Sequence, residues 1–445
     1  MSATKPHESW GRYPKSEPAR IVELSWISQV PDLNRLPHPI LPYGKGRSYG
    51  DCCLNNGGTL LDVSGLDRFI RFDPETGLLR CEAGVTLQTI LELIVPTNWF
   101  LPVTPGTQFV TVGGAIANDV HGKNHHRAGS FGCHLQRLEL LRSDTGKVVC
   151  SRECNRDLFE ATIGGLGLTG LILWAEFQLK RICGPWIDCE KLRFETLEEF
   201  FEFSASSDKE YEYTVAWLDC SSSGGERGRR GIFMRGNHST APTRKSGRPR
   251  AVPALRGFHI PISLVRRPTI RAFNWMYLHT QWHQRTRSTL HYEKFFYPLD
   301  RVPDWNRFYG RRGFLQYQFV VPYERREGVT EILDLLAESR EACSLAILKV
   351  FGDIESPGLL SFPRPGVTLT LDFPFRGEST LQLFGQFDQV VREYQGAVYP
   401  AKDARMSAKS FQRYFPRWTE FSSFIDPSFG SDFWRRVATP LTASQ

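Results

Sequence analysis

Two glycine-containing segments of this 445-residue chain hold the residue types best suited to binding a cofactor. The first, residues 42–51 (PYGKGRSYGD), has three glycines that allow an irregular turn with inward-pointing backbone N–H groups, while Lys45 and Arg47 can neutralise phosphates. The second, residues 105–122 (PGTQFVTVGGAIANDVHG), places two adjacent glycines before small residues, so that a helix N-terminus can approach a pyrophosphate. Neither segment matches the phosphate loop of nucleotide triphosphatases, and together they predict a site for a large anionic cofactor.

A third glycine segment has the spacing G-x-G-x-x-G at Gly165, Gly167 and Gly170, which is typical of dinucleotide-binding folds. Those folds need a strand before the glycines and a helix after them. Here the expected order is reversed, because residues 155–163 have a helical pattern and residues 171–179 have a strand pattern. We therefore expect these glycines to form a tight turn between a helix and a strand.

Polar residues interrupt three otherwise apolar segments in the second half of the chain. Gln316 and Gln318 alternate in GFLQYQFVVP, so in a strand they share one face. Lys349 interrupts AILKVFG, and Thr370 and Asp372 stand two residues apart in LTLDFPF. Two amides on one face suit sugar hydroxyls or the ring of a cofactor, although an exposed sheet face and a buried, hydrogen-bonded strand acid explain the same pattern.

Four histidines, His121, His125, His126 and His134, raise the alternative of a metal site, because His side chains four residues apart on a helix can share an ion. The glycines at positions 122 and 129 argue against a regular helix here. We expect no metal. We expect His121 to lie beside the cofactor, with structural hydrogen bonding as the alternative.

The elements that must position these residues follow no regular strand–helix repeat, which indicates an α+β fold. Hydrophobic spacing of three and four predicts a helix at residues 86–95, and further helices are expected at 155–163, 328–340 and 380–394. Residues 134–150 are expected to form a strand, a turn and a strand, and residues 189–217 a helix and then a strand. The C-terminal segment is expected to pack back on the first domain.

The glycine segments also carry a resemblance to a known family. In this order, GKGRSYGD, PGTQFVTVGGAIANDVHGKNHH and GGLGLTGLI resemble the PCMH-type FAD-binding domain of vanillyl-alcohol-oxidase-type flavoproteins. Downstream, FFYPLDRVPDWNRFYGRRGFLQYQFVVP, LKVFG, LTLDFPF and YPAKDARMS are similar to the branch of this family that acts on polyprenylphosphoryl ribose. The resemblance implies a two-domain α+β flavoprotein. Residues 1–184 and 398–445 would form the FAD-binding domain, and residues 185–397 an antiparallel-sheet substrate domain.

Carried onto this sequence, the family's FAD contacts fall on Gly46, Arg47, Ser48, Tyr49, Gly50, Asp51, Gly106, Thr111, Val112, Gly113, Gly114, Asn118, His121, Ile172 and Tyr399. The implied catalytic residues are Lys402, Gln318, Tyr49 and His121. The implied substrate contacts are Gln316, Gln318, Lys349, Thr370, Asp372 and Lys402. Relatives that attach the flavin covalently often carry His where this chain has Arg47, so the resemblance implies non-covalent FAD.

The resemblance also implies an activity. It is the oxidation of the ribose 2'-hydroxyl of a polyprenylphosphoryl-β-D-ribose to the 2'-keto intermediate. This reaction is the first half of epimerisation to the arabinose form used in cell-wall polysaccharide synthesis, and an NAD(P)H-dependent short-chain reductase would be the partner that completes it. Free sugars, aldonolactones and alditols are the alternative substrates within the same fold.

The charge of the chain is concentrated in one region. The net charge is +7, yet residues 226–271 hold twelve Lys or Arg and one acid, a local +11 that leaves −4 elsewhere. Aromatic residues are scarce in this basic segment, so we expect no nucleic acid partner. We predict a basic mobile loop at about residues 221–268 that contacts an anionic membrane.

The N-terminus shows no secretory signal, and no run of about 20 apolar residues occurs. We therefore expect a cytoplasmic protein that is peripheral at the inner membrane face, with export to the periplasm alongside a partner left open.

Overall fold

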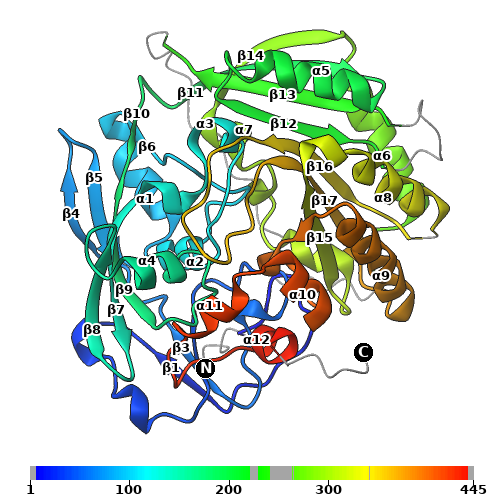
Figure 1. Cartoon of the computed structure of the whole chain (residues 1–445). Coiled ribbons are helices and arrows are strands. Elements are labelled where there is room, and N and C mark those ends of the chain that lie inside the picture. The colour runs from blue at the N-terminus through cyan, green and yellow to red at the C-terminus, as the bar shows by residue number, and fades with distance from the viewer. Residues whose placement is uncertain (1–6, 221–228, 241–262, 264, 340, 439–445) are drawn as a thin grey trace.

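The computed structural model describes residues 7–220, 229–240, 263, 265–339 and 341–438 (Figure 1). Its strands form four sheets, of which the largest has eight strands. Figure 1 shows the blue and cyan N-terminal elements on one side of the molecule and the large green-to-orange sheet on the other, with the red C-terminal helices returning to the N-terminal half. Helices mixed with mainly antiparallel sheets confirm the predicted α+β class.

The N-terminal half contains a parallel sheet, an antiparallel sheet and a strand pair. The parallel sheet has the order β1 (Arg20–Glu23), β3 (Thr59–Asp62), β2 (Ile40–Tyr43). The antiparallel sheet has the order β4 (Phe69–Asp73), β5 (Leu78–Glu82), β9 (Leu171–Gln178), β7 (Leu135–Arg142), β8 (Gly146–Ser151). The pair consists of β10 (Lys180–Arg181) and β6 (Trp99–Phe100).

Helix α1 (Leu87–Ile94) covers this half and confirms the predicted helix at residues 86–95. Its four apolar residues at spacing three and four are all buried in one core cluster with β5, β7 and β9. Thr86 caps the helix by accepting a hydrogen bond from the backbone N–H of Thr89. Helix α4 (Arg156–Thr162) ends before the third glycine segment, and β9 begins after it. Gly164, Gly167 and Gly170 have positive φ there, so the predicted tight turn is confirmed.

The large sheet is antiparallel throughout its described pairings. Its order is β14 (Arg285–His291), β11 (Trp186–Phe194), β13 (Gly231–His238), β12 (Tyr213–Leu218), β16 (Leu345–Phe351), β17 (Gly366–Pro374), β15 (Phe314–Val321), β18 (Ala397–Val398). Its helices are α5 (Leu197–Ser207), α6 (Arg267–His279), α7 (Tyr292–Phe296), α8 (Glu327–Glu338) and α9 (Glu378–Glu393).

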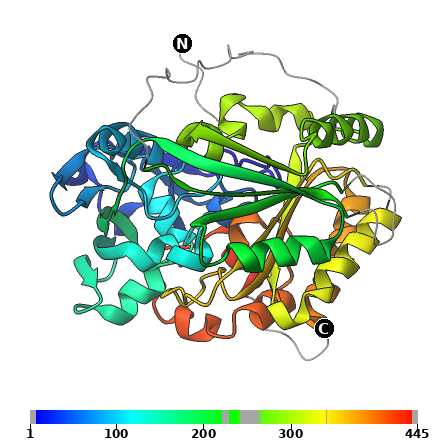
Figure 2. The same cartoon turned by 90° about the horizontal axis from the view of Figure 1, so that it is seen from above.

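The two faces of this sheet differ in polarity because side chains alternate along each strand. On one face, residues such as Tyr317, Phe319 and Leu371 pack against α5, α8 and α9 in the largest apolar core. On the other face, Gln316 pairs with Asp372 and Gln318 pairs with Thr370 across β15 and β17. In Figure 2 the green α5 and the yellow α8 lie on one side of the sheet and the yellow-green α6 lies on the other. The prediction that the two glutamines share a face is confirmed.

The C-terminal segment forms α10 (Ala408–Tyr414), α11 (Trp418–Ser422) and α12 (Asp432–Val437). It packs back on the N-terminal half, as predicted, since Phe429 forms a parallel bridge with Ile40 and Arg436 pairs with Asp51. In the described part of the chain, no helix combines the length and the apolar character needed to cross a membrane.

Two sequence predictions need correction. Residues 231–238, which fall inside the predicted loop 221–268, form the buried strand β13 between β11 and β12. Helix α6 likewise begins at Arg267, whereas residues 221–228, 241–262 and 264 lie outside the described residues. Residues 189–217 were predicted as a helix and then a strand; α5 and β12 (Tyr213–Leu218) have this order, but the segment begins within the strand β11, so its predicted start is wrong. Both strands depend on pairing with distant strands, which local composition does not report.

Candidate active site

Backbone hydrogen bonds join three distant segments around the predicted site. The N–H of Tyr49, in the first glycine segment, donates to the carbonyl of Ala401 at 2.9 Å. The N–H of Tyr399 donates to the carbonyl of Gln318 in β15 at 2.9 Å, and the Tyr399 hydroxyl donates to the carbonyl of Asn118 at 2.8 Å. Both glycine segments and the large sheet therefore meet at residues 399–402.

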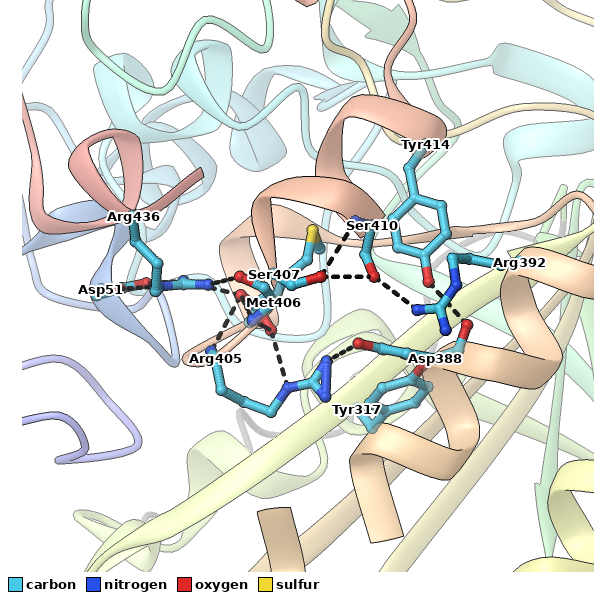
Figure 3. A network of polar contacts seen from close by, with 11 residues as sticks. Asp51, Tyr317, Asp388, Arg392, Arg405, Met406, Ser407, Ser410, Tyr414 and Arg436 are labelled. Atoms are coloured by element: carbon cyan, nitrogen blue, oxygen red, sulfur yellow. Dashed lines mark hydrogen bonds and ion pairs between the residues drawn. The ribbon is translucent and has the colours of Figure 1, made fainter. Parts of the chain in front are cut away.

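The short 3-10 helix Pro400–Lys402 is fixed from one side by the C-terminal helices (Figure 3). Asp403 accepts hydrogen bonds from the backbone N–H of Met406 and, at 2.9 Å, from Arg436 of α12. Arg436 also pairs with Asp51 at 2.7 Å. A Cβ on Gly50 would lie 1.6 Å from the Asp403 carbonyl oxygen, so this close approach requires glycine.

The same segment is fixed from the other side by the large sheet and α9 (Figure 3). The guanidinium of Arg405 pairs with the carboxylate of Asp388 in α9. That carboxylate also accepts a hydrogen bond of 2.8 Å from the hydroxyl of Tyr317, whose side chain points to the apolar face of β15. The backbone of Lys402 is therefore held between the two halves of the molecule.

Lys402 places its amine over the ring of Tyr49, with Nζ 3.6 Å from the ring centroid. Burial lowers the pKa of Lys402, and the charge of Asp372 opposes this shift. Burial raises the pKa of Asp372, against a hydrogen bond from Gln316 and the charge of Lys402. Gln316 Nε2 donates to Asp372 Oδ1 at 2.5 Å, while Asp372 Oδ2 is buried with no partner among the described residues. A lysine that can exist as a neutral amine thus lies near a carboxylate in a dry environment.

His121 lies opposite Gln318, and the Nε2 atoms of the two side chains are 2.9 Å apart. Because an amide nitrogen donates, the imidazole Nε2 accepts and the proton of the neutral ring is on Nδ1. Burial lowers the pKa of His121, helped by the charge of Lys349, so the neutral ring is favoured. Nδ1 is buried and unpartnered among the described residues. It is a donor available to a ligand.

Lys349 adds a second buried amine to this polar face. Burial lowers the pKa of Lys349 to about 8. Its charge also lowers the pKa of Lys402 and His121, which indicates that these groups are close. Two lysines and one carboxylate leave a local excess of positive charge when all are ionised, which suits an anionic ligand.

The two glycine segments meet as an anionic cofactor requires. A Cβ on Gly44 would lie 2.5 Å from Thr111 Oγ1, so the segments touch at this glycine. Thr111 caps α2 (Val112–Ala117) by accepting a hydrogen bond of 3.1 Å from the N–H of Gly114. Arg47 is held over the ring of Trp10 at 3.9 Å, and its Nε is buried without a partner among the described residues. A half-buried guanidinium at a glycine-rich turn, with its Nε lacking a partner among the described residues, fits the phosphates of FAD.

The other predicted cofactor contacts lie in several different environments. Gly46 has a φ of +59° and lies against the Tyr43 hydroxyl. Ser48 accepts a backbone hydrogen bond from Trp10 through its carbonyl. Asp51 forms its ion pair with the C-terminal helix. Val112, Gly113 and Ile172 contact the apolar core of the N-terminal half, whereas a Cβ on Gly106 would meet nothing within 4 Å.

Sequence reasoning missed several residues of this site. Lys123 is buried, donates to the Phe295 carbonyl, and has its pKa lowered by burial to about 7. In the sequence, Lys123 could have been noticed as a charged residue two positions after His121, in a segment of small and polar residues. The rings of Phe351 and Phe362 lie 4.9 Å and 5.8 Å from His121 and have no equivalent local signal.

The four histidines have separate partners. His121 faces Gln318, His126 contacts the Tyr211 carbonyl at 3.0 Å, and His134 contacts the Ala128 carbonyl at 2.8 Å. His125 begins α3 (His125–Ala128) and packs on Phe351. Within the described residues no group of three or more potential metal ligands occurs.

Comparison with known proteins agrees with this geometry. Residues 19–151 match the model of the FAD binding domain. The chain is 35% identical to decaprenylphosphoryl-beta-D-ribose oxidase of Mycolicibacterium smegmatis over 413 residues, which cover 89% of each chain. The chain belongs to the decaprenylphosphoryl-β-D-ribose oxidase family. It is an FAD-dependent oxidoreductase of the two-domain vanillyl-alcohol-oxidase type.

Other relatives extend the family at lower coverage. An uncharacterised protein of Streptomyces coelicolor is 33% identical over 79% of this chain and its own full length. D-lactate dehydrogenase of Anaerostipes hadrus is 24% identical over 40% of this chain. The two long matches are thus to a decaprenylphosphoryl-beta-D-ribose oxidase and to an uncharacterised protein, and the shorter one is to a protein named for a different activity.

Proposed function

We propose that this chain oxidises the 2'-hydroxyl of a polyprenylphosphoryl-β-D-ribose to the 2'-ketone, the first half of an epimerisation to the arabinose form. The observation that carries the proposal is the polar face of the large sheet, where Lys349 and Asp372 lie with Gln316 and Gln318, together with Lys402 of the adjoining 3-10 helix. Amides suit sugar hydroxyls, and the excess of lysines suits the phosphodiester of such a substrate. The name of the Mycolicibacterium smegmatis relative supports the same substrate class.

The proposed roles of the side chains follow from their positions. FAD held by the two glycine segments would supply the acceptor for the hydride of the carbon that carries the hydroxyl. Lys402, as a neutral amine, takes up the hydroxyl proton, and Asp372 stabilises the ammonium that forms. Gln318 and the Nδ1–H of His121 orient the sugar, while Lys349 attracts the phosphate. Gln316 and Thr370 line the same face beside them.

We propose that FAD is bound without a covalent bond, because the arginine at position 47 cannot form one. The proposed contacts are the predicted positions in the two glycine segments together with Asn118, Ile172 and Tyr399.

We propose residues 1–184 and 398–445 as the FAD-binding domain and residues 185–397 as the substrate domain. A separate NAD(P)H-dependent short-chain reductase is the proposed partner that consumes the ketone, and peripheral contact with a membrane is proposed because the substrate carries a lipid.

The test is anaerobic reduction of the enzyme-bound FAD, followed by its absorbance. A prenylphosphoryl ribose should bleach the flavin band within single turnover, whereas an aldonolactone or a free pentose at the same concentration should leave the band unchanged. Faster bleaching by the aldonolactone would contradict the proposal and favour a sugar or alditol oxidase of the same fold.

A further inference from the structure

The outer face of α6 and the residues just after its end expose an unusual group of large apolar side chains. Four of the thirteen exposed large hydrophobic residues in the described part of the chain lie between positions 273 and 282. They are Phe273, Trp275, Met276 and Trp282, with exposed fractions of 49%, 59%, 55% and 82%. We call these four residues the α6 surface. Two exposed tryptophans this close together have no role in the core of a single chain.

The inner face of α6 is firmly attached to the large sheet. Leu278 is fully buried with Trp217 and Ile232, and the ring of Tyr277 lies 4.8 Å from that of Trp217. Asn274 donates a hydrogen bond of 2.8 Å to Asp219 at the end of β12. Helix α6 is therefore packed on the large sheet through its inner face, and the apolar side chains of its outer face are not needed for that packing.

The chain segment that carries the α6 surface has charged residues of one sign only. From Val265 to His291 the chain contains five arginines and three histidines and no Asp or Glu. Arg285 and Arg287 share the buried Glu190 with Arg235, so a positive excess remains on this edge of the sheet. Tryptophan with arginine is the composition of protein surfaces that lie in the headgroup region of a bilayer.

A direct row of side chains connects α6 to the proposed active site. Trp217 pairs with Ile347, Ile347 with Thr370, and Thr370 with Gln318 across four adjacent strands. Directly paired residues share a face of the sheet, with Cβ atoms about 5 Å apart. The row is apolar at the α6 end and polar at the Gln318 end. A lipid-linked sugar likewise has an apolar chain at one end and a polar sugar at the other.

We propose that the α6 surface docks on an anionic phospholipid bilayer and so brings the apolar end of this row to the membrane. The purpose of the docking rests on the proposed lipid-linked substrate, but the docking itself can be measured without any substrate. The aromatic rings enter the interface and the arginines attract anionic headgroups, at a strength that falls with salt.

The test uses flotation of the FAD-loaded enzyme with phosphatidylcholine vesicles that do or do not contain phosphatidylglycerol. The enzyme should float with the anionic vesicles, and less so at high salt or without phosphatidylglycerol. Replacing both rings (Trp275→Ser with Trp282→Ser) should lower the partition coefficient by about tenfold or more, because each buried ring contributes. Trp26→Ser is the matched control, since Trp26 is 49% exposed in the N-terminal half. It should leave flotation unchanged.

Activity gives a second readout. The double variant should reduce its FAD at the normal rate with a short-chain, dispersed prenylphosphoryl ribose, and about tenfold more slowly with a long-chain substrate embedded in vesicles. Unchanged flotation of the double variant would overturn the proposal, as would a tryptophan-dependent dimer that does not bind vesicles. If no prenylphosphoryl ribose reduces the flavin, the proposed function fails, whereas flotation still decides the docking surface.

Discussion

The behaviour of Lys402 depends on Asp372, because the two side chains are close enough for each charge to act on the other. Burial disfavours the charged form of each, while the charge of each favours the charged form of the other. The carboxylate also accepts the hydrogen bond from Gln316, which fixes its position in β17. Asp372 is therefore a positioning residue that sets how readily Lys402 gives up its proton before the substrate arrives.

Asp372→Asn should move the pH dependence of flavin reduction. Lys402 can take up the hydroxyl proton only when neutral, so the rate rises as pH rises through its pKa. The carboxylate raises that pKa, so removing its charge should shift the acidic limb of the profile to lower pH. The measurement is the rate of anaerobic FAD reduction against pH.

Two further variants test whether the shift of the pH profile comes from the action of Asp372 on Lys402. Asp353→Asn removes an exposed carboxylate and should leave the profile unchanged. Lys402→Met should lower the rate by about 10²–10⁴ at pH values above the pKa of Lys402, and should remove the acidic limb of the profile, while FAD stays bound. A profile of Asp372→Asn that moves to higher pH, or does not move, would show that Asp372 does not act on Lys402.

At the scale of elements, alternation within single strands was readable from the sequence and strand pairing was not. The shared face of Gln316 and Gln318 follows from a period of two, and α1 follows from apolar spacing of three and four. The contact of Gln318 with His121 joins residues 197 positions apart, so no local pattern reports it. The flavin segments were recognisable because some of their glycines are required by the local backbone, as at Gly46, whose φ is +59°.

Strand β13 shows why strand pairing could not be predicted from the sequence. Its residues lie between segments rich in Ser, Gly and Arg, which hide a short apolar run. The strand is buried because β11 and β12 pair with both of its edges. Its charged residue, Arg235, is accommodated by Glu190 on β11 at 2.6 Å. A basic residue that looks like part of a loop is thus half of a buried ion pair.

Glu190→Gln should destabilise this edge of the sheet. Burial alone would raise the pKa of Glu190, but hydrogen bonds from Arg285, Arg287 and Arg235 hold it at about 2. The variant leaves three guanidinium groups without their carboxylate and should lose about 3 kcal/mol of unfolding free energy at pH 7. Because the pKa is depressed on folding, this contribution is present above about pH 4.5 and is lost as pH falls toward 2.

Urea unfolding of the wild type and of Glu190→Gln, at pH 7 and at pH 4, measures the difference between their unfolding free energies. The gap between wild type and Glu190→Gln should narrow at the lower pH. Glu198→Gln, an exposed residue in the first turn of α5, is the control and should change the unfolding free energy by less than about 0.5 kcal/mol. Equal stability of Glu190→Gln and wild type at pH 7 would contradict the role of the pair.

At the scale of the whole molecule, the C-terminal helices connect the two halves at the active site. Arg436 on α12 contacts Asp51 beside the first glycine segment and Asp403 beside Lys402. Both carboxylates are almost fully buried, with exposed fractions of 4% and 3%. Arg405 continues the connection to Asp388 on α9 (Figure 3). The position of Lys402 therefore depends on residues at the far end of the chain.

Arg436→Ala should loosen this connection. It leaves the buried carboxylate of Asp51 without its cation and leaves Asp403 with only the 4.0 Å contact to Arg405, and breaking a buried pair costs about 3–5 kcal/mol. We expect a lower unfolding temperature, faster loss of FAD on dilution and slower flavin reduction, because the Asp51 side and the Lys402 side of the site are no longer held together. Burial raises the pKa of Asp51, and the charge of Asp403 adds to this, so protonation at mildly acidic pH should partly restore the variant.

Arg435→Ala is the matched control from the same helix. Arg435 is 42% exposed and pairs with Asp432 one turn earlier, so its loss should cost less than about 1 kcal/mol and leave FAD retention unchanged. FAD release and thermal unfolding of the two variants at pH 7 and pH 5.5 separate the effects. If Arg436→Ala matched Arg435→Ala in both measurements, the C-terminal helices would not hold the site together. Recovery of Arg436→Ala at pH 5.5 would instead identify the carboxylate of Asp51, left without its cation, as the cause.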